Sequence, residues 1–227
     1  MIKRIFILFL SLIESLIRNI SGSIGEKLRY FYYKYRLQYC GKNVIIKENV
    51  YFDNCKSIII DDNTMIDRNV ILMAGNVNLT KYKHRKMSNV KFSENEGVLF
   101  IGKNTHIAPN CILQAHAGIK ISDNCGISSG VKIYSLINLP NNSLNLEEII
   151  EFTNRTNNAY YFASPVYIGK NVGISLNSII MPGVSILNDS FIASNSVVMT
   201  NIKENSFAGG NPAKKIKDRF KNYGENN

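Results

Sequence analysis

The sequence lacks the features of three common protein classes. Its four cysteines, Cys40, Cys55, Cys111 and Cys125, show no C-x-x-C spacing and are too sparse in 227 residues for a disulfide scaffold. We expect them to be reduced and mostly buried, as in a cytoplasmic protein. The N-terminal apolar run, Ile5 to Ile13, is shorter than the roughly 20 residues of a membrane span. It is followed by no A-x-A-like cleavage site, so a signal peptide is not expected.

Acidic residues are also scarce, with 17 Asp and Glu against 27 Lys and Arg, a formal net charge of +10. Before residue 48, Glu14 and Glu26 oppose nine basic residues, which gives 9 − 2 = +7. Basic residues beside apolar ones predict contact with an anionic membrane surface more than with nucleic acid. Acidic glycans and the phosphates of CoA are other partners for this charge, and solubility alone is the plain alternative.

Two helices are predicted before residue 40. Residues 1–20 read as an amphipathic helix that lies on a membrane or packs on a partner subunit, with packing against the rest of the chain as the alternative. Residues 24–39 contain six aromatic residues, and five of them interleave with Arg29, Lys34 and Arg36: Tyr30, Phe31, Tyr32, Tyr33 and Tyr35. Such interleaving occurs in proteins that bind single-stranded nucleic acid, but no other nucleic-acid motif is present, so an interfacial or packing helix is preferred.

A strict repeat dominates the second half of the chain. Branched aliphatic residues recur every six positions between 166 and 199: Ile168, Ile174, Ile180, Ile186, Ile192 and Val198. Neither a helix nor a simple strand has this period, and fixed-period similarity indicates a stacked repeat. Glycine and asparagine between the aliphatics suit tight corners. We therefore expect short parallel strands that coil and stack their aliphatics into one continuous core.

The same interval begins near residue 41 and is interrupted twice. Residues 73–97 are polar and read as a loop or projecting insertion, in which His84 is solvated. Residues 136–164 read as an active-site loop with a short helix at 145–152. Between them, the aliphatic series shifts by two residues around 114–118, which predicts an enlarged corner that holds His116. The second insertion leaves the coil at the next turn of the same corner.

These six-residue units resemble the hexapeptide repeat of the left-handed parallel β-helix acyltransferases. The resemblance covers roughly residues 41–220 and implies an all-β solenoid with three sixes per coil. We therefore divide the chain into three parts: N-terminal helices (1–40), a left-handed β-helix (41–208) with the two insertions, and a C-terminal helix and tail (209–227). The motif GGNPAKK at 209–215 resembles the one that closes the repeats in that family. We expect a helix over 213–220, with Asn211 as its cap and Pro212 as its first residue.

The run SPVYIGKNVGISLNSIIMPGVSI, together with GGNPAKKI, resembles the polysaccharide and sugar O-acetyltransferase branch. The resemblance implies a cytoplasmic homotrimer, peripheral at the membrane if the N-terminal helices bind lipid. It further implies transfer of acetyl from acetyl-CoA to a glycan or sugar hydroxyl, as in capsule biosynthesis, with active sites between subunits, no metal and no nucleic acid. Candidate CoA-binding residues are the small corner residues and two lysines late in the chain: Gly173, Ser175, Ala193, Gly210, Lys214 and Lys215.

A sugar hydroxyl needs a base as it attacks the thioester, and histidine suits that task. The chain has three histidines. His116 is the preferred base because it lies in the irregular corner, His106 is the alternative, and the absence of any catalytic histidine is the third reading. Several family members carry a histidine after the coil end that Ile133, Tyr134 and Ser135 form here, where this chain has none. The candidate acceptor-binding residues are Tyr134, Ser135, Asn138, Tyr160 and Tyr161.

Three alternatives remain open. The missing loop histidine is compatible with a non-catalytic trimeric scaffold of a glycan-synthesis complex. A serine O-acetyltransferase-like enzyme is a second alternative, although such enzymes usually carry a larger N-terminal helical domain. A metal enzyme of the γ-carbonic anhydrase type needs three histidine ligands from neighbouring coils. The separations here, 106 − 84 = 22 and 116 − 106 = 10, do not fit it.

Overall fold

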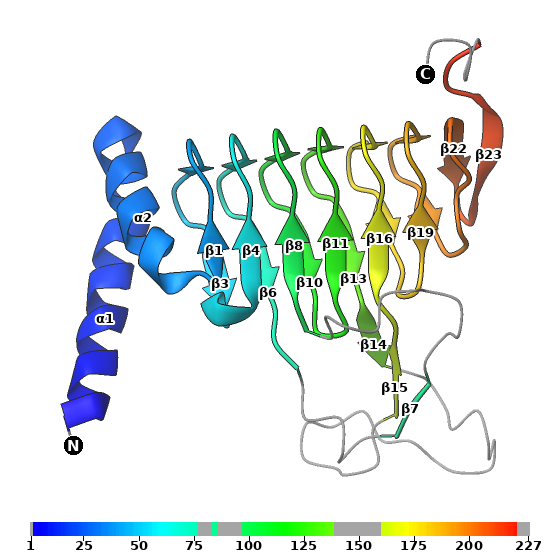
Figure 1. Ribbon diagram of the computed structural model, residues 1–227. Coiled ribbons are helices and arrows are strands. Elements are labelled where there is room, and N and C mark those ends of the chain that lie inside the picture. The colour runs from blue at the N-terminus through cyan, green and yellow to red at the C-terminus, as the bar shows by residue number, and fades with distance from the viewer. Residues whose placement is uncertain (1, 77–82, 86–96, 139–159, 222–227) are drawn as a thin grey trace.

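The chain coils into a stack of short strands with two helices at its N-terminal end, as Figure 1 shows. The computed structural model describes residues 2–76, 83–85, 97–138 and 160–221. Consecutive strands enter three sheets in turn, and each strand then pairs in parallel with the strand one coil earlier and one coil later. The predicted coil of stacked parallel strands is therefore confirmed.

The three sheets are named here in the order in which the chain first enters them. The first sheet contains β1 (Tyr39–Cys40), β4 (Ile58–Ile60), β8 (Leu99–Ile101), β11 (Ile119–Ile121), β16 (Val166–Ile168) and β19 (Ser185–Ile186). The second sheet contains β2 (Ile45–Ile46), β5 (Met65–Ile66), β9 (His106–Ile107), β12 (Gly126–Ile127), β17 (Gly173–Ile174), β20 (Phe191–Ile192), β22 (Ser206–Gly210) and β23 (Ala213–Asp218). The third sheet contains β3 (Tyr51–Asp53), β6 (Ile71–Met73), β10 (Ile112–Gln114), β13 (Lys132–Tyr134), β18 (Ile179–Ile180) and β21 (Val197–Val198).

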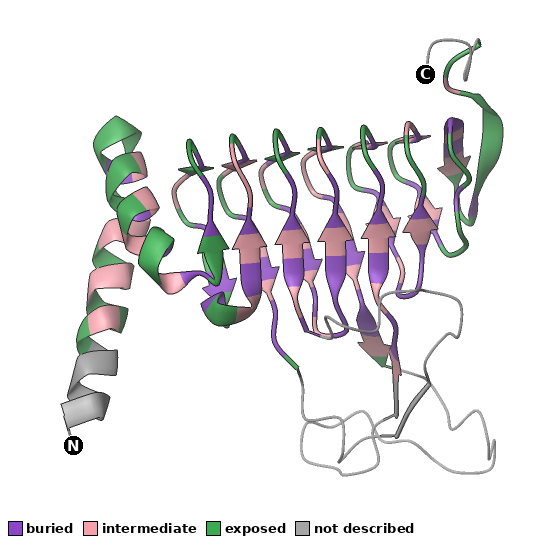
Figure 2. Cartoon of the chain, in the orientation of Figure 1, coloured by how far each residue is buried: buried purple, intermediate pink, exposed green. Residues whose placement is uncertain are grey.

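The six-residue series forms the core. Every member of the series from Ile168 to Val198 is fully buried, with no exposed surface. The earlier series, from Ile101 to Ile119, is buried in the same way. Figure 2 shows buried positions recurring along the first sheet, which faces the viewer. One short strand cannot shield its aliphatic side chain, so each coil relies on its neighbours for burial.

Asparagines occupy the corners between sheets and stack on one another. Asn43, Asn63, Asn104 and Asn124 follow strands of the first sheet, and all four have positive φ. Asparagine tolerates this left-handed conformation better than most residues because its short polar side chain bonds locally. The side chains join into a ladder, with Asn43 donating to Asn63 at 3.0 Å and Asn104 donating to Asn124 at 3.0 Å. This ladder satisfies polar groups at the corners without entering the core.

Both predicted N-terminal helices are present, as α1 (Ile2–Arg18) and α2 (Gly22–Arg36). The fully buried Arg29 of α2 ties them to the first coil. Its Nε donates to the carbonyl of Ile46 at 2.8 Å, and its Nη1 donates to the carbonyl of Ile20 at 2.7 Å, just beyond the end of α1. Carbonyl groups at a helix C-terminus have no partner within the helix, so a guanidinium is well suited to satisfy them.

The prediction of a C-terminal helix over 213–220 was wrong. Residues Ala213–Asp218 form β23, which pairs antiparallel with β22 through a two-residue turn at Asn211 and Pro212. Strand β22 stands at the end of the second sheet, where an unpaired edge would leave backbone groups exposed. Pairing with β23 satisfies that edge, whereas a short isolated helix is marginal in water. The expected cap and first helical residue are turn residues instead.

The two predicted insertions leave the coil at the same corner and meet outside it. A fourth, three-stranded sheet joins β14 (Leu136–Asn138), β15 (Tyr160–Ala163) and β7 (Lys83–Arg85). Strand β7 lies within the first insertion, so the expectation of a loop there is corrected for residues 83–85. The short helix expected at 145–152 lies outside the described residues.

Candidate functional site

One corner of the coil, where the chain passes from the third sheet to the first, carries most of its irregular structure. We call it the third-to-first corner. The 3-10 helix η1 (Cys55–Ser57) lies there in the first coil, the two insertions leave there, and residues 115–118 form an enlarged turn between β10 and β11. The two-residue shift in the repeat is thus confirmed as a change in the length of this corner.

His116 lies in the enlarged turn and is partly buried. Its Nδ1 is 3.0 Å from the backbone carbonyl of Gly75, one coil earlier at the same corner. A carbonyl oxygen can only accept, so this contact assigns the proton to Nδ1. In the neutral ring, Nε2 then carries the lone pair and is the proton acceptor.

Gly75 was not among the expected site residues. It follows β6 at the start of the first insertion, has φ of +90° and is buried. A Cβ at this position would lie 1.8 Å from Nδ2 of Asn54, so the corner accepts only glycine here without a shift of Asn54. The signal that could have found it is a glycine two residues after the end of a coil strand, where the sequence becomes polar.

Ser135 fixes the backbone around His116. Its hydroxyl accepts from the N–H of Ala117 at 2.9 Å and donates to the carbonyl of Gln114 at 2.8 Å. The side chain is fully buried, so it braces the His116 turn from the next coil and does not face an acceptor. Its neighbour Ser164 is also buried, and the Ser164 hydroxyl has no hydrogen-bond partner in the described part of the chain.

The other expected acceptor-binding residues lie beside this turn. Tyr134 ends β13 next to Ser135 and is partly buried, and Asn138 is exposed at the end of β14. The backbone of Asn138 pairs with that of Tyr161 in β15, which in turn pairs with that of His84 in β7. Tyr160 precedes Tyr161 in the same strand. The fourth sheet therefore brings segments of both insertions together beside the His116 corner.

The expected CoA-binding residues gather at a different corner. Gly173 is in β17, Ser175 follows it, Ala193 follows β20, and Gly210 ends β22, so all four lie in or just after neighbouring strands of the second sheet. The Ser175 hydroxyl is 2.8 Å from that of Ser194. Lys214 and Lys215 are exposed on β23, where Lys215 forms an ion pair with Asp218. These residues therefore lie along the corner where the chain passes from the second sheet to the third, which we call the second-to-third corner. The third sheet separates this corner from His116.

His106 lies elsewhere again. It starts β9 in the second sheet, is half exposed, and its Nε2 is 3.5 Å from a carboxylate oxygen of Asp67. All four cysteines are buried and free, as expected. Burial raises the pKa of the Cys40, Cys111 and Cys125 thiols to about 11, which disfavours the thiolate and a nucleophilic role.

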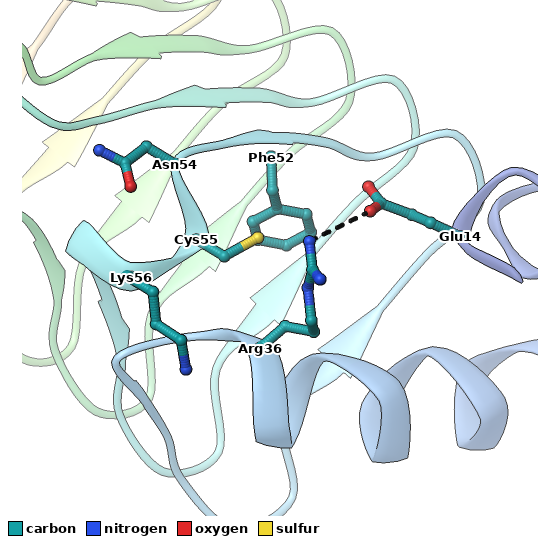
Figure 3. Close-up of a pocket in the computed structure, with 6 residues that line it drawn as sticks. All are labelled: Glu14, Arg36, Phe52, Asn54, Cys55 and Lys56. Carbon is teal, nitrogen blue, oxygen red and sulfur yellow. Dashed lines mark ion pairs between the residues drawn. The ribbon is translucent and has the colours of Figure 1, made fainter. Parts of the chain in front are cut away.

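A cavity of about 300 Å³ lies where both helices meet the first coil, and Figure 3 shows its lining: Glu14, Arg36, Phe52, Asn54, Cys55 and Lys56. Glu14 forms ion pairs with Arg18 at 3.0 Å and Arg36 at 4.0 Å. It also accepts from the hydroxyl of Tyr33 at 3.1 Å. These contacts attach the helices to the coil, and none of the expected catalytic or CoA-binding residues lines the cavity.

Among the residues that the structure places, no group of three or more His, Cys, Asp or Glu side chains is arranged to hold a metal ion. In the same residues, neither helix is long and apolar enough to span a bilayer.

No family model matches the chain, but several curated proteins do. A Saccharomyces cerevisiae protein named as an acetyltransferase is 34% identical over 119 residues, 52% of this chain and 55% of that protein. The dTDP-4-amino-4,6-dideoxy-D-glucose acyltransferase of Escherichia coli is 29% identical over 183 residues, 80% of this chain and 82% of that enzyme. The galactoside O-acetyltransferase of Escherichia coli is 30% identical over 125 residues, 54% of this chain and 59% of that enzyme. The chain spans little more than half the length of the first and third of these relatives.

Solved structures share the fold. AntD, an N-acyltransferase from Bacillus cereus solved with dTDP-4-amino-4,6-dideoxyglucose and coenzyme A, aligns with a TM-score of 0.66 and 23% identity, over 90% of this chain and 92% of that one. A hexapeptide-repeat acetyltransferase from Vibrio cholerae, solved with acetyl coenzyme A, aligns with a TM-score of 0.56 and 18% identity, over 92% and 84%. The chain thus shares its fold with solved hexapeptide-repeat acetyltransferases and resembles curated acyl- and acetyltransferases in sequence.

Proposed function

We propose that this protein transfers an acetyl group from acetyl-CoA to a hydroxyl of a surface polysaccharide or its sugar precursor, with His116 as the general base. The observation that carries the proposal is the contact between Nδ1 of His116 and the carbonyl of Gly75. It leaves Nε2 unprotonated in the neutral ring, which is the state that a general base requires.

In the proposed reaction, Nε2 of His116 takes the proton of the acceptor hydroxyl as its oxygen attacks the thioester carbonyl carbon. A tetrahedral intermediate forms and collapses, the carbon–sulfur bond breaks, and the imidazolium returns the proton to the CoA sulfur. No acyl-enzyme is formed. The thioester is already activated, so the protein supplies mainly orientation and proton transfer.

Relatives support a sugar acceptor, since two of them are named for acylation of a dideoxy amino sugar and a galactoside. We favour the hydroxyl over the amine as the attacking group because a sugar hydroxyl has a very high pKa and needs a base. A neutral amine already carries the lone pair with which it attacks. The base assigned to His116 is thus more useful to O-acetylation than to N-acetylation.

We further propose that the coil is left-handed and that the enzyme is a cytoplasmic homotrimer with sites between subunits. Within one chain, the CoA candidates and His116 are separated by the third sheet. A six-residue side of the coil is at most about 20 Å long, since an extended residue spans about 3.3 Å. Juxtaposing the second-to-third corner of one subunit with the third-to-first corner of another would bring donor and base together. The exposed Lys214 and Lys215 would then meet the CoA phosphates.

The test compares His116→Asn with His116→Ala in a thiol-release assay that uses acetyl-CoA and a set of sugar, nucleotide-sugar and polysaccharide acceptors. Asparagine keeps a donor for the Gly75 carbonyl but supplies no base. Both variants should lose about 10²- to 10⁴-fold in kcat, the usual contribution of general-base catalysis. His106→Ala and His84→Ala are matched controls and should retain turnover.

Undiminished turnover in His116→Asn would refute the assignment of the base. Loss of turnover in His84→Ala instead would move the base to the first insertion. A wild-type trimer that neither transfers nor hydrolyses acetyl-CoA would favour the scaffold over the enzyme.

A further inference from the structure

The two acidic residues of the N-terminal helices are turned toward the coil and neutralised. Glu14 is 12% exposed and is held by Arg18, Arg36 and the hydroxyl of Tyr33. Glu26 forms an ion pair with Lys47, which precedes β3 in the first coil. The chain has no other Asp or Glu before residue 48. The outward surface of both helices is therefore free of acidic side chains over the residues whose side chains are described.

Helix α2 presents an apolar and basic face away from the coil, which we call its outer face. Its members are spaced three or four residues apart: Ile24, Lys27, Leu28, Phe31, Lys34 and Tyr35. Residues at this spacing lie on one side of a helix. The apolar members are 69%, 42%, 59% and 79% exposed, and Figure 2 shows this part of α2 as exposed. The two lysines lie together along one edge of the apolar strip.

A second apolar strip runs along α1. Phe9, Leu12 and Leu16 are between 58% and 64% exposed, at the same three- and four-residue spacing. The exposed polar residues between them, Ser11 and Ser15, carry no charge. An apolar strip of this extent on a water-facing helix marks an interaction surface. Its lack of charge excludes a role as an ordinary solvated helix face.

We propose that the outer face of α2, together with the strip on α1, docks on an anionic lipid surface. Apolar side chains in the centre with lysines at the edge match a helix that lies in the plane of the headgroups. Lysine stems cover apolar surface in that position while their ammonium groups reach the phosphates. Charge complementarity decides between occupants: an anionic surface attracts Lys27 and Lys34, whereas a second copy packed on this face by a two-fold axis would bring the same lysines together.

The position of the helices fits this arrangement. Figure 1 shows α1 and α2 at one end of the coil stack and β23 at the other. Docking through the helices would leave the sides of the coil, including the third-to-first corner, open to solvent and to other subunits. The proposal does not depend on the proposed acetyl transfer, because none of its residues belongs to the candidate active site.

The experiment is co-sedimentation of the full-length protein with two kinds of vesicle: phosphatidylcholine alone, and phosphatidylcholine with about one-third phosphatidylglycerol. We expect binding to the anionic vesicles, weakened by salt. The double variant Lys27→Gln/Lys34→Gln should bind them on the order of 30-fold more weakly, as expected for two lysines near an anionic surface. Phe31→Ser should also weaken binding, because it removes buried apolar area from the docked state.

Lys203→Gln/Lys221→Gln makes the same change in charge among exposed residues near the C-terminal end of the coil, and it should bind as the wild type does. Circular dichroism and gel filtration establish that each variant keeps its fold and assembly. Three results would overturn the proposal: no binding of the wild type to anionic vesicles, equal loss with both lysine pairs, or dissociation of the assembly by Phe31→Ser. The last result would assign the face to contact between copies of the chain. Turnover on a soluble acceptor should be unchanged in all three variants, which separates this proposal from that of the function.

Discussion

Ser135→Ala offers a direct test of how the His116 turn is held. The Ser135 hydroxyl accepts from the N–H of Ala117 and donates to the carbonyl of Gln114. Alanine removes both contacts. The Gln114 carbonyl keeps a second partner, the N–H of Ser135 at 3.0 Å, so it remains satisfied. The N–H of Ala117 loses its acceptor in a position that is only 7% exposed.

The expected cost follows from that one orphaned donor. A buried N–H left without a partner destabilises a protein by about 1–3 kcal/mol. Because Ala117 adjoins His116, the turn that carries the proposed base should also become less well ordered. A displacement of about 1 Å in a catalytic group can lower turnover by about 10²-fold, so kcat should fall on the order of tenfold or more.

Ser164→Ala is the matched control. It deletes the same hydroxyl from an equally buried serine at the same corner, but this hydroxyl has no hydrogen-bond partner among the described residues. Its backbone N–H, which donates to the carbonyl of Ser135 at 2.9 Å, is unaffected. Removing an unsatisfied buried hydroxyl should leave stability unchanged or raise it slightly.

The two variants are compared by urea unfolding, and by kcat well below the unfolding temperature. The reasoning predicts a lower urea midpoint and a lower kcat for Ser135→Ala alone. If both variants lose the same stability, burial of a serine rather than the bridge to Ala117 explains the cost. If Ser135→Ala unfolds more easily but keeps the wild-type kcat and its pH profile, Ser135 supports the fold without positioning His116.

Two further predictions concern the scaffold. Asn104 has φ of 53° and lies in the middle of the corner ladder, between Asn63 and Asn124. Asn104→Ala should therefore lower the free energy of unfolding by about 1–2 kcal/mol, while Asn104→Gly, which accepts the left-handed conformation, should recover about 1 kcal/mol of this in the same urea titration. Equal losses would show that the side-chain ladder, and not the backbone conformation, sets the cost. Burial raises the pKa of Cys111 and Cys125 from 9.0 to about 11, so the folded state holds protons that the unfolded state has released. Stability from this source is complete below about pH 9 and is lost as the pH rises toward about 11. The urea midpoint should fall over that window, and the fall should be shallower in Cys111→Ala/Cys125→Ala; an identical pH dependence in both proteins would contradict the assignment.

The sequence was most informative where burial alone decides the structure. Ile168 to Val198 are core residues because each must stack on its neighbours, and the interval of six shows that directly. The shift of the repeat around His116 was visible for the same reason. Positions defined by the core could thus be predicted from local sequence and period.

Positions defined by long-range pairing could not be predicted from the sequence in this way. Asn211 and Pro212 are suitable residues for the start of a helix, but the residues after them pair as a strand with the open edge of β22. His116 meets Gly75 from 41 residues away, across an insertion that prevents the register from being counted. Ser135 was correctly placed at a coil end, but the period does not show whether such a side chain points outward or, as it does, into the turn.

The concentration of both insertions at one corner has a consequence for how such a chain can vary. After each excursion the coil resumes in register: β8 pairs with β4 below and with β11 above, and β16 pairs with β11. The length and composition of the outward segments are therefore uncoupled from the ladders that hold the protein together. A protein built in this way can exchange the outward segments at this corner while the frame of stacked strands stays intact.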